Sequence, residues 1–251
     1  MKIEWTWTMQ SLVAVVALAQ PWLIALYKKW RKTKVRVDLR GLPEIGFSGF
    51  GNTLGIIGVI HCGAGSVFVR DMKIKVCRTE DDAKATLEWL AIKSLKITPA
   101  VDETSIATGF VVSESSPVPF NIVFVSKVPW DEHLNRYRLR SEEIRNEVQN
   151  NRELDMTDED VVIKTTYLLT NDQVGVEVWS RIDKSLFWQT GNYECELHLS
   201  LADGRQVNCS KVKFYISEDQ SKTLGYNAVG ILDSARNLEP HFNFIYPGPA
   251  N

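Results

Sequence analysis

The most constraining feature of the sequence is an apolar run close to its start. From Ser11 to Tyr27 only Ser11 and Gln20 have clearly polar side chains, and Pro21 is the one helix-breaking residue. The 19 residues from Met9 to Tyr27 would form a helix about 28 Å long, close to the roughly 30 Å hydrocarbon core of a bilayer. Aromatic side chains, which favour the headgroup layer, stand before the run at Trp5 and Trp7 and at its far end at Trp22, Tyr27 and Trp30. We therefore expect a single transmembrane helix at residues 9–27, preceded by a short segment, 1–8.

Two other interpretations of the run remain open. Ala17-Leu18-Ala19 has the small-residue spacing of a signal-peptidase site, so the run could be a cleaved secretory signal. Against this, Lys2 and Glu4 cancel where a signal peptide carries a positive cluster, and apolar residues continue beyond the cleavage point. A buried helix of a soluble domain is the third possibility. We favour the uncleaved anchor.

A basic collar follows the run and predicts its orientation. Residues 28–40 carry a net charge of +6, whereas residues 1–27 are neutral. Basic residues beside a span stay on the cytoplasmic side and bind anionic headgroups. We expect the membrane-proximal cations to make these contacts, namely Lys28, Lys29, Arg31, Lys32 and Lys34. The protein is thus predicted to be single-pass, with its C-terminal body facing the cytoplasm.

The remainder of the chain has the composition of a folded, acidic body. Of the 251 residues, 44% are apolar and 24% charged, which excludes a disordered, collagen-like or multi-span membrane protein. The total charge of −2, with +6 in the collar, leaves −8 for residues 41–251. An acidic body gives no support to nucleic-acid binding.

The first part of the body, residues 41–128, has the texture of β-strands. Apolar and polar residues alternate, and glycine turns separate the segments. The expected strands here, together with the end of the collar, are 35–39, 44–48, 53–62, 67–78, 106–113 and 119–126. Segment 84–92 fits strand and helix equally. Gly49, Gly51 and Gly55 miss the dinucleotide-binding spacing and precede a strand, which indicates a turn or bulge.

One long amphipathic helix is expected at residues 129–152. This stretch contains no glycine, its only proline opens it, and apolar residues recur every three or four positions. The stripe comprises Trp130, Leu134, Tyr137, Ser141, Ile144 and Val148. Packing of this stripe against a sheet is the favoured interpretation. The alternative is a homo-oligomer formed through the same helix.

The last part, residues 153–251, is predicted to be a second β-rich unit with a less regular tail from 218. Its expected strands are 161–169, 174–181, 185–189, 192–201 and 205–217. A two-residue turn at Asp203-Gly204 would place Cys195 opposite Val212 and His198 opposite Cys209, with a bulge near Ser210. These strands suggest a mainly β body of one or two Ig-like β-sandwich units, interrupted by the helix.

The cysteines are expected to be free thiols. Neither Cys62 with Cys77 nor Cys195 with Cys209 is placed to bridge across its own turn, although pairs across the sheet stay open. Free thiols agree with a reducing cytoplasm.

No motif identifies a catalytic, cofactor or metal site, so no site residue is assigned. The one acidic cluster lacks the glycine and glutamate of an EF-hand and is read as a solvated linker, Glu153, Asp155, Asp158, Glu159 and Asp160.

Three functions remain in competition because a fold does not fix a function. The favoured one is a membrane-anchored, non-enzymatic binding or adaptor module with a protein partner. The second is a membrane-proximal hydrolase with a dispersed carboxylate or metal site. The third is a structural subunit of a membrane-bound oligomer.

Overall fold

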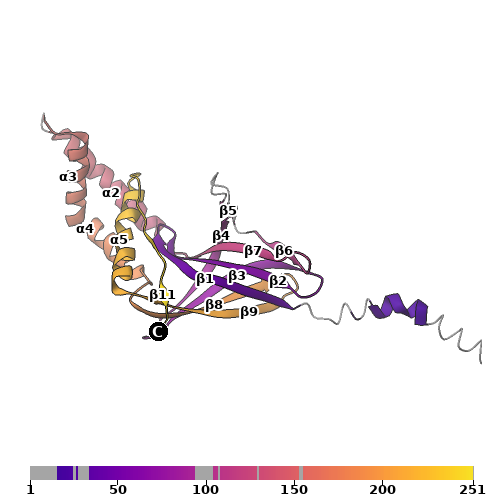
Figure 1. Cartoon of the computed structure of the whole chain (residues 1–251). Coiled ribbons are helices and arrows are strands. Elements are labelled where there is room, and N and C mark those ends of the chain that lie inside the picture. Colours follow the sequence, from indigo (N-terminus) through magenta and orange to yellow (C-terminus); the bar gives the residue numbers. More distant parts are fainter. Residues whose placement is uncertain are drawn as a thin grey trace, which may run out of the picture.

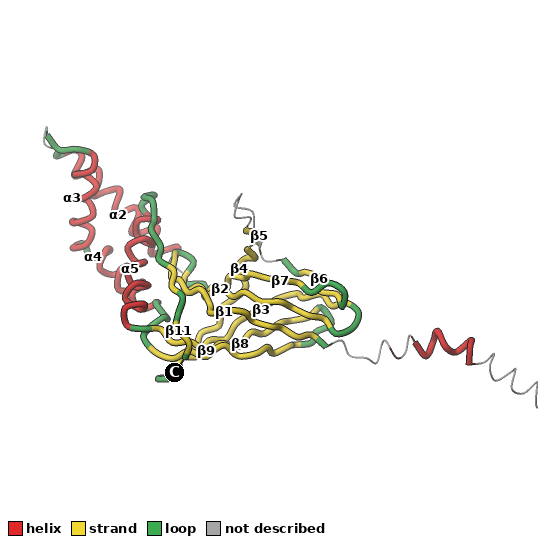
Figure 2. Tube along the Cα trace, in the orientation of Figure 1, coloured by secondary structure: helices red, strands yellow, loops and turns green. Residues whose placement is uncertain are grey.

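A computed structural model describes residues 16–24, 27, 34–93, 104–106, 108–128, 130–152 and 155–250. The body is mainly β, with one curled antiparallel sheet and a group of helices at one end of it (Figures 1 and 2). The strands before the helices are β1 (Val35–Ser48), β2 (Gly51–Cys62), β3 (Ser66–Arg78), β4 (Lys84–Lys93), β5 (Thr104–Ile106), β6 (Phe110–Ser113) and β7 (Val118–Ser126). The helices are α2 (Asp131–Asn150), α3 (Asp158–Asn171), α4 (Gln173–Ser185) and α5 (Glu218–Ala235). The later strands are β8 (Gly191–Leu201), β9 (Gln206–Ile216), β10 (Phe244–Ile245) and β11 (Gly248–Pro249).

The sheet curls until its two long edge strands come together. Its order is β10-β1-β2-β7-β4-β3-β8-β9-β11, with β5 on β4 and β6 on β3. The C-terminal segment pairs with both edges: Ile245 lies opposite Ile45 of β1, and Gly248 lies opposite Tyr215 of β9. This segment therefore joins the edge strands β1 and β9 and supplies partners for backbone groups that an open sheet would leave unpaired.

The two predicted β-rich stretches contribute to this same sheet. β3 pairs with β8 from Val69 to Arg78, which joins strands from 41–128 to strands from 153–251. Prediction of the first stretch is largely confirmed: 35–39 and 44–48 form β1 with a bulge between Arg40 and Glu44, and 84–92 is a strand. The predicted strand 106–113 is shorter, since β6 begins at Phe110.

The interior of the sheet follows the expected alternation. Along β8 every second residue is buried, and the predicted face is the interior one, Tyr193, Cys195, Leu197, Leu199 and Leu201. The Tyr193 ring stacks on Phe214 of β9 with centroids 5.3 Å apart. Trp188, which is fully buried, donates its indole N–H to the carbonyl oxygen of Gly46 at 3.0 Å. Large aromatic side chains thus fill the sheet interior near the helices.

The strands predicted at 161–169, 174–181 and 185–189 are wrong. The first two segments lie in helices α3 and α4, and after Ser185 the chain runs to Gly191 without a strand. The segment after 218 also contains an unpredicted helix, α5. Local capping explains these results. Thr157 and Ser217 each form a capping box with the residue three positions later, and Asp172 accepts a hydrogen bond from the backbone N–H of Val174.

The predicted long helix is confirmed as α2. Its stripe is buried within this chain at Trp130, Tyr137, Ile144 and Val148, and α2 packs mainly against the other three helices. Contact with the sheet is made at the start of the helix, where the Trp130 ring lies 5.8 Å from the Phe47 ring of β1.

The N-terminal predictions fall largely on residues that the structure does not describe. Residues 1–15, 25–26 and 28–33, which hold most of the predicted anchor and collar, lie outside the described part. Residues 16–24 are helical, and their apolar side chains are exposed, with Leu18 at 74% and Trp22 at 75%. Among the described residues, no helix combines the length and apolar character that crossing a membrane requires.

Candidate ligand pocket

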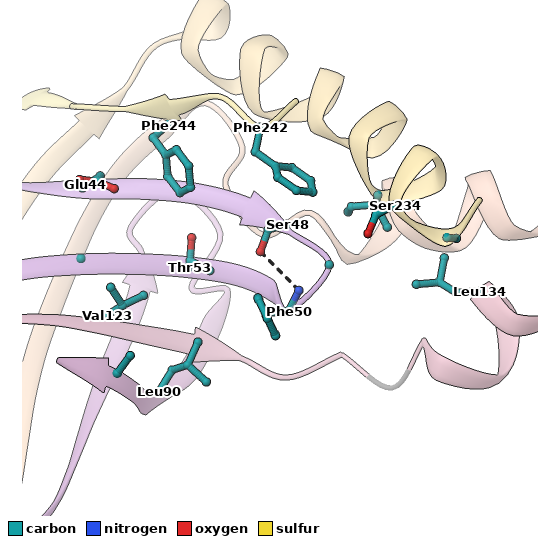
Figure 3. Close-up of a pocket in the computed structure, with 15 residues that line it drawn as sticks. Glu44, Ser48, Phe50, Thr53, Leu90, Val123, Leu134, Ser234, Phe242 and Phe244 are labelled. Carbon is teal, nitrogen blue, oxygen red and sulfur yellow. Dashed lines mark hydrogen bonds between the residues drawn. The ribbon is translucent and has the colours of Figure 1, made fainter. Parts of the chain in front are cut away.

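A pocket of about 540 Å³ lies on the outer face of the sheet, where the sheet meets the helices (Figure 3). Strands β1, β2, β4 and β7 form its floor, α2 and α5 close one end, and the C-terminal segment forms a wall. Its size falls in the range typical of small-molecule sites. We name it the outer-face pocket.

The pocket has room above the sheet because several outward-facing residues of its floor are small. In the strand register Gly46 lies beside Thr53, and Glu44, Gly55, Val123 and Ala91 form the next row. Side chains on opposite faces alternate along a strand, so the neighbours of these residues point inward. Glycine and alanine leave space above the sheet that larger residues would fill.

The walls are aromatic and aliphatic. Phe242 and Phe244 come from the C-terminal segment, and Phe50 comes from the turn between β1 and β2 (Figure 3). Leu90 reaches the pocket because the pairing of β4 with β7 shifts between Trp89 and Ala91. Such a bulge redirects a side chain.

The C-terminal wall is held by a buried amide on α5. Asn227, which is fully buried, donates from Nδ2 to the carbonyl oxygens of Phe47 at 2.9 Å and Asn243 at 2.8 Å. Its Oδ1 accepts the backbone N–H of Asn243 at 2.7 Å. These bonds fix the segment that carries Phe242 and Phe244.

The polar groups in the pocket are few. The Thr53 hydroxyl points into the pocket (Figure 3), the residue is only 6% exposed, and no described residue hydrogen-bonds this hydroxyl. Ser48 Oγ accepts the backbone N–H of Phe50 at 3.3 Å. At the rim, the Glu44 carboxylate accepts the Tyr246 hydroxyl at 3.1 Å, and this bond raises the pKa of Tyr246. Of the described residues in the lining, Glu44 alone is charged.

A second apolar pocket of about 470 Å³ lies among the helices, with Trp179 and Val229 in its lining. Its polar rim is already satisfied in part, because Arg236 Nη1 donates to Thr166 Oγ1 at 2.8 Å. The outer-face pocket is the better candidate, since it combines space with a hydroxyl that faces the pocket and that no described residue hydrogen-bonds.

Three of the five residues read as a solvated linker lie instead at the start of α3, whereas Asp155 lies in the exposed turn before it. Asp158, Glu159 and Asp160 lie in its first turn, where carboxylates interact favourably with the helix dipole. Asp158 pairs with Arg152 at 2.7 Å. Asp160 accepts the backbone N–H of Thr157 at 2.8 Å, and the Thr157 hydroxyl and N–H together lower the pKa of this carboxyl. Glu153 lies outside the described residues, and within them no three ligand-type side chains group as a metal site would.

The cysteines are free, as expected. Burial raises the pKa of Cys209 to about 12 and raises that of Cys195 further, so neither thiol is activated as a nucleophile. The predicted pairing of His198 with Cys209 is wrong, because His198 lies opposite Asn208. Cys195 does lie opposite Val212.

Sequence reasoning did not find the outer-face pocket. It read Gly49, Gly51 and Gly55 as a turn or bulge, and Gly49 does lie in the turn between β1 and β2. The usable signal was the run Gly51, Thr53, Gly55, which places small residues on one face of β2. The aromatic wall contributed by residues far along the chain had no local signal.

Comparison of the chain with protein-family models, with curated proteins and with solved structures finds no match.

Proposed function

We propose that this protein is a membrane-anchored, non-enzymatic binding module. In this proposal residues 9–27 span the bilayer, and the collar cations from Lys28 to Lys34 bind anionic headgroups. The body, with a sandwich-like packing of the curled sheet, faces the cytoplasm and carries the recognition surface. The apolar run, the +6 collar and the acidic body support this arrangement.

The outer-face pocket is the observation that carries the binding function. It offers aromatic walls, a floor of small residues and the Thr53 hydroxyl, which faces the pocket (Figure 3) and is not hydrogen-bonded by any described residue. Such a lining favours capture of an apolar ligand, which is stabilised by removal of its surface from water. The Ser48, Thr53 and Ser234 hydroxyls share the pocket with no histidine or lysine that could activate them.

The position of the pocket agrees with a cytoplasmic ligand. β1 begins at Val35 at the end of the sheet away from the helices (Figure 1), and Glu44 at the pocket rim lies nine residues later. At about 3.3 Å per residue the strand carries the rim up to roughly 30 Å from Val35, the first residue of the strand. The proposal therefore places the pocket beyond the headgroup layer.

The oligomer alternative has less support. The α2 stripe that could join two copies is buried by the chain's own helices, so self-association would need another surface.

The experiment uses the full chain in sealed vesicles. We expect it to stay in the membrane through an alkaline carbonate wash, and protease added on the body side to remove the body. We also expect an uncharged apolar fluorophore to bind beyond the signal of protein-free vesicles, and Ala91→Leu, which fills the pocket, to abolish that excess. Release by carbonate would contradict the anchor. An excess that Ala91→Leu leaves unchanged would contradict the pocket.

A further inference from the structure

We propose that the outer-face pocket selects an uncharged amphiphile, a small molecule with an apolar body and one hydroxyl or carbonyl group. This inference rests on the proposed binding function and adds the chemical class of the ligand. Three observations carry it: the shape and lining of the pocket, the Thr53 hydroxyl, and the sign of the only charge at the rim.

The apolar body follows from the lining. Phe242 and Phe244 face Leu90 and Val123 across a floor that includes Gly55 (Figure 3). Phe50 is 67% exposed and Phe244 50% exposed, although both line the pocket. A slender chain or flat ring lying on the small floor residues would bury both aromatic side chains further.

The polar group follows from Thr53. The Thr53 hydroxyl faces the open pocket, and none of the described residues hydrogen-bonds it, so both its donor and its acceptor are available to a ligand (Figure 3). Ser48 and Ser234 line the same pocket, so its lining carries hydroxyl groups from β1, β2 and α5. Hydroxyls both donate and accept, which suits an alcohol or a carbonyl.

The absence of charge follows from the rim. Among the described residues that line the pocket there is no Lys, Arg or His, and the one charged residue is Glu44. A carboxylate or phosphate head would enter an apolar site without a counter-ion and beside a like charge. Glu44 is only half-buried and already accepts the Tyr246 hydroxyl, so it does not form a buried counter-ion for a cation either. The uncharged head remains as the chemistry that fits.

The test compares decanol, decanoate and decylammonium, which share one chain and differ in head charge. The full-length protein is placed in lipid nanodiscs with labelled methyl groups, and free probe concentrations are corrected for uptake by empty nanodiscs. The pocket reporters are the methyls of Leu90, Val123 and Ile231, and Ile57 reports on the same sheet face outside the lining. We expect decanol to shift the pocket methyls with at least tenfold higher affinity than either charged probe, and to leave Ile57 unchanged.

Variants locate the two selecting groups. Thr53→Val keeps the side-chain shape and removes the hydroxyl, so the decanol affinity should fall about fivefold. Thr86→Val makes the same change at an exposed strand position outside the lining and should have no effect. Glu44→Gln should raise the affinity for decanoate.

The outcomes separate this inference from the proposed function. Decanoate binding as tightly as decanol, or a Thr53→Val variant with unchanged decanol affinity, would overturn the ligand class while leaving the pocket a binding site. If no probe shifts any pocket methyl, the binding function itself is contradicted.

Discussion

The two faces of β1, β2 and β7 differ sharply where these strands meet the helices. On the inner face Phe47, Leu54 and Phe124 are all at most 1% exposed and fill the sheet interior. On the outer face, one residue along β2 and β7, Thr53 and Val123 line the outer-face pocket, and Gly46 of β1 lies under the Phe244 ring. The same strands therefore supply stability on one side and a site on the other, and the exchange of large for small residues separates the two roles.

Substitutions on the inner face should lower the free energy of unfolding the most. Phe124→Ala removes a fully buried ring, and incomplete collapse of the interior leaves a cavity. We expect the free energy of unfolding to fall by about 3–5 kcal/mol, measured by chemical denaturation of the full-length protein in nanodiscs. A loss below about 1 kcal/mol would show that the sheet interior is not the stabilising core.

The next effect comes from filling the outer face at Gly46, beneath the Phe244 ring. A Cβ at Gly46 would lie 2.6 Å from both the Phe244 ring and Thr53 Oγ1, so Gly46→Ala must displace the C-terminal wall. We expect a loss of about 1–3 kcal/mol, together with weaker ligand binding. Gly49→Ala is the matched control, because nothing lies within 4 Å of its added Cβ. Equal effects of the two substitutions would argue against a tight contact between the wall and the floor.

A smaller, local contribution to stability comes from the N-cap of helix α3, away from the two faces of the sheet. Thr157→Ala removes the N-cap hydroxyl of α3 and should lower the free energy of unfolding by about 0.5–2 kcal/mol. Thr170→Ala, at an exposed position late in the same helix, serves as control. If the two variants lose equal stability, the cap does not hold the start of α3.

The same cap predicts a pH dependence. Because the pKa of Asp160 is lowered in the folded protein, its contribution to stability is present above the ordinary value of 3.8 and is lost as the pH falls through the lowered pKa. The difference in unfolding free energy between the protein and Asp160→Asn should therefore shrink as the pH drops below 3.8. Denaturation at a series of pH values checks this, and a difference that grows on acidification would contradict it.

The smallest effect is expected at the pocket rim. Phe50→Ala removes a ring that is 67% exposed and should change the free energy of unfolding by no more than about 0.5 kcal/mol. Ligand binding should weaken nonetheless. A large loss of stability would show that Phe50 belongs to the core and would blur the distinction between the two faces.

The sheet was largely predictable because alternation is a local signal, as β8 shows. The hairpin from β8 to β9 marks the limit. The turn is a three-residue loop, in which the Leu201 N–H donates to the Arg205 carbonyl and Gly204 has a φ of +85°, so His198 lies opposite Asn208. The predicted bulge then restores the register, and Cys195 lies opposite Val212. The Cys195–Val212 pairing was therefore predicted correctly although the turn was not, because the shift from the longer loop and the shift from the bulge cancel.

The helices α3 and α4 were missed because β-branched residues were given more weight than capping residues. The sequence from Val161 to Leu169 is rich in Val, Ile and Thr, yet Thr157 and Asp160 begin a helix there. Packing against α2 then overrides the weak strand preference. The pocket could not be predicted, because its wall depends on closure of the sheet. This closure pairs Phe244 with Gly46, two residues that are far apart in the sequence.

The central claim is that the outer-face pocket holds an uncharged amphiphile in the cell. The most direct measurement extracts the membrane-inserted protein and identifies by mass spectrometry the small molecules that co-purify with it and with the Ala91→Leu variant. We predict a near-stoichiometric uncharged amphiphile in the unmodified protein that is depleted at least tenfold in the variant. Equal amounts in both proteins, or an anionic molecule in the pocket, would contradict the account.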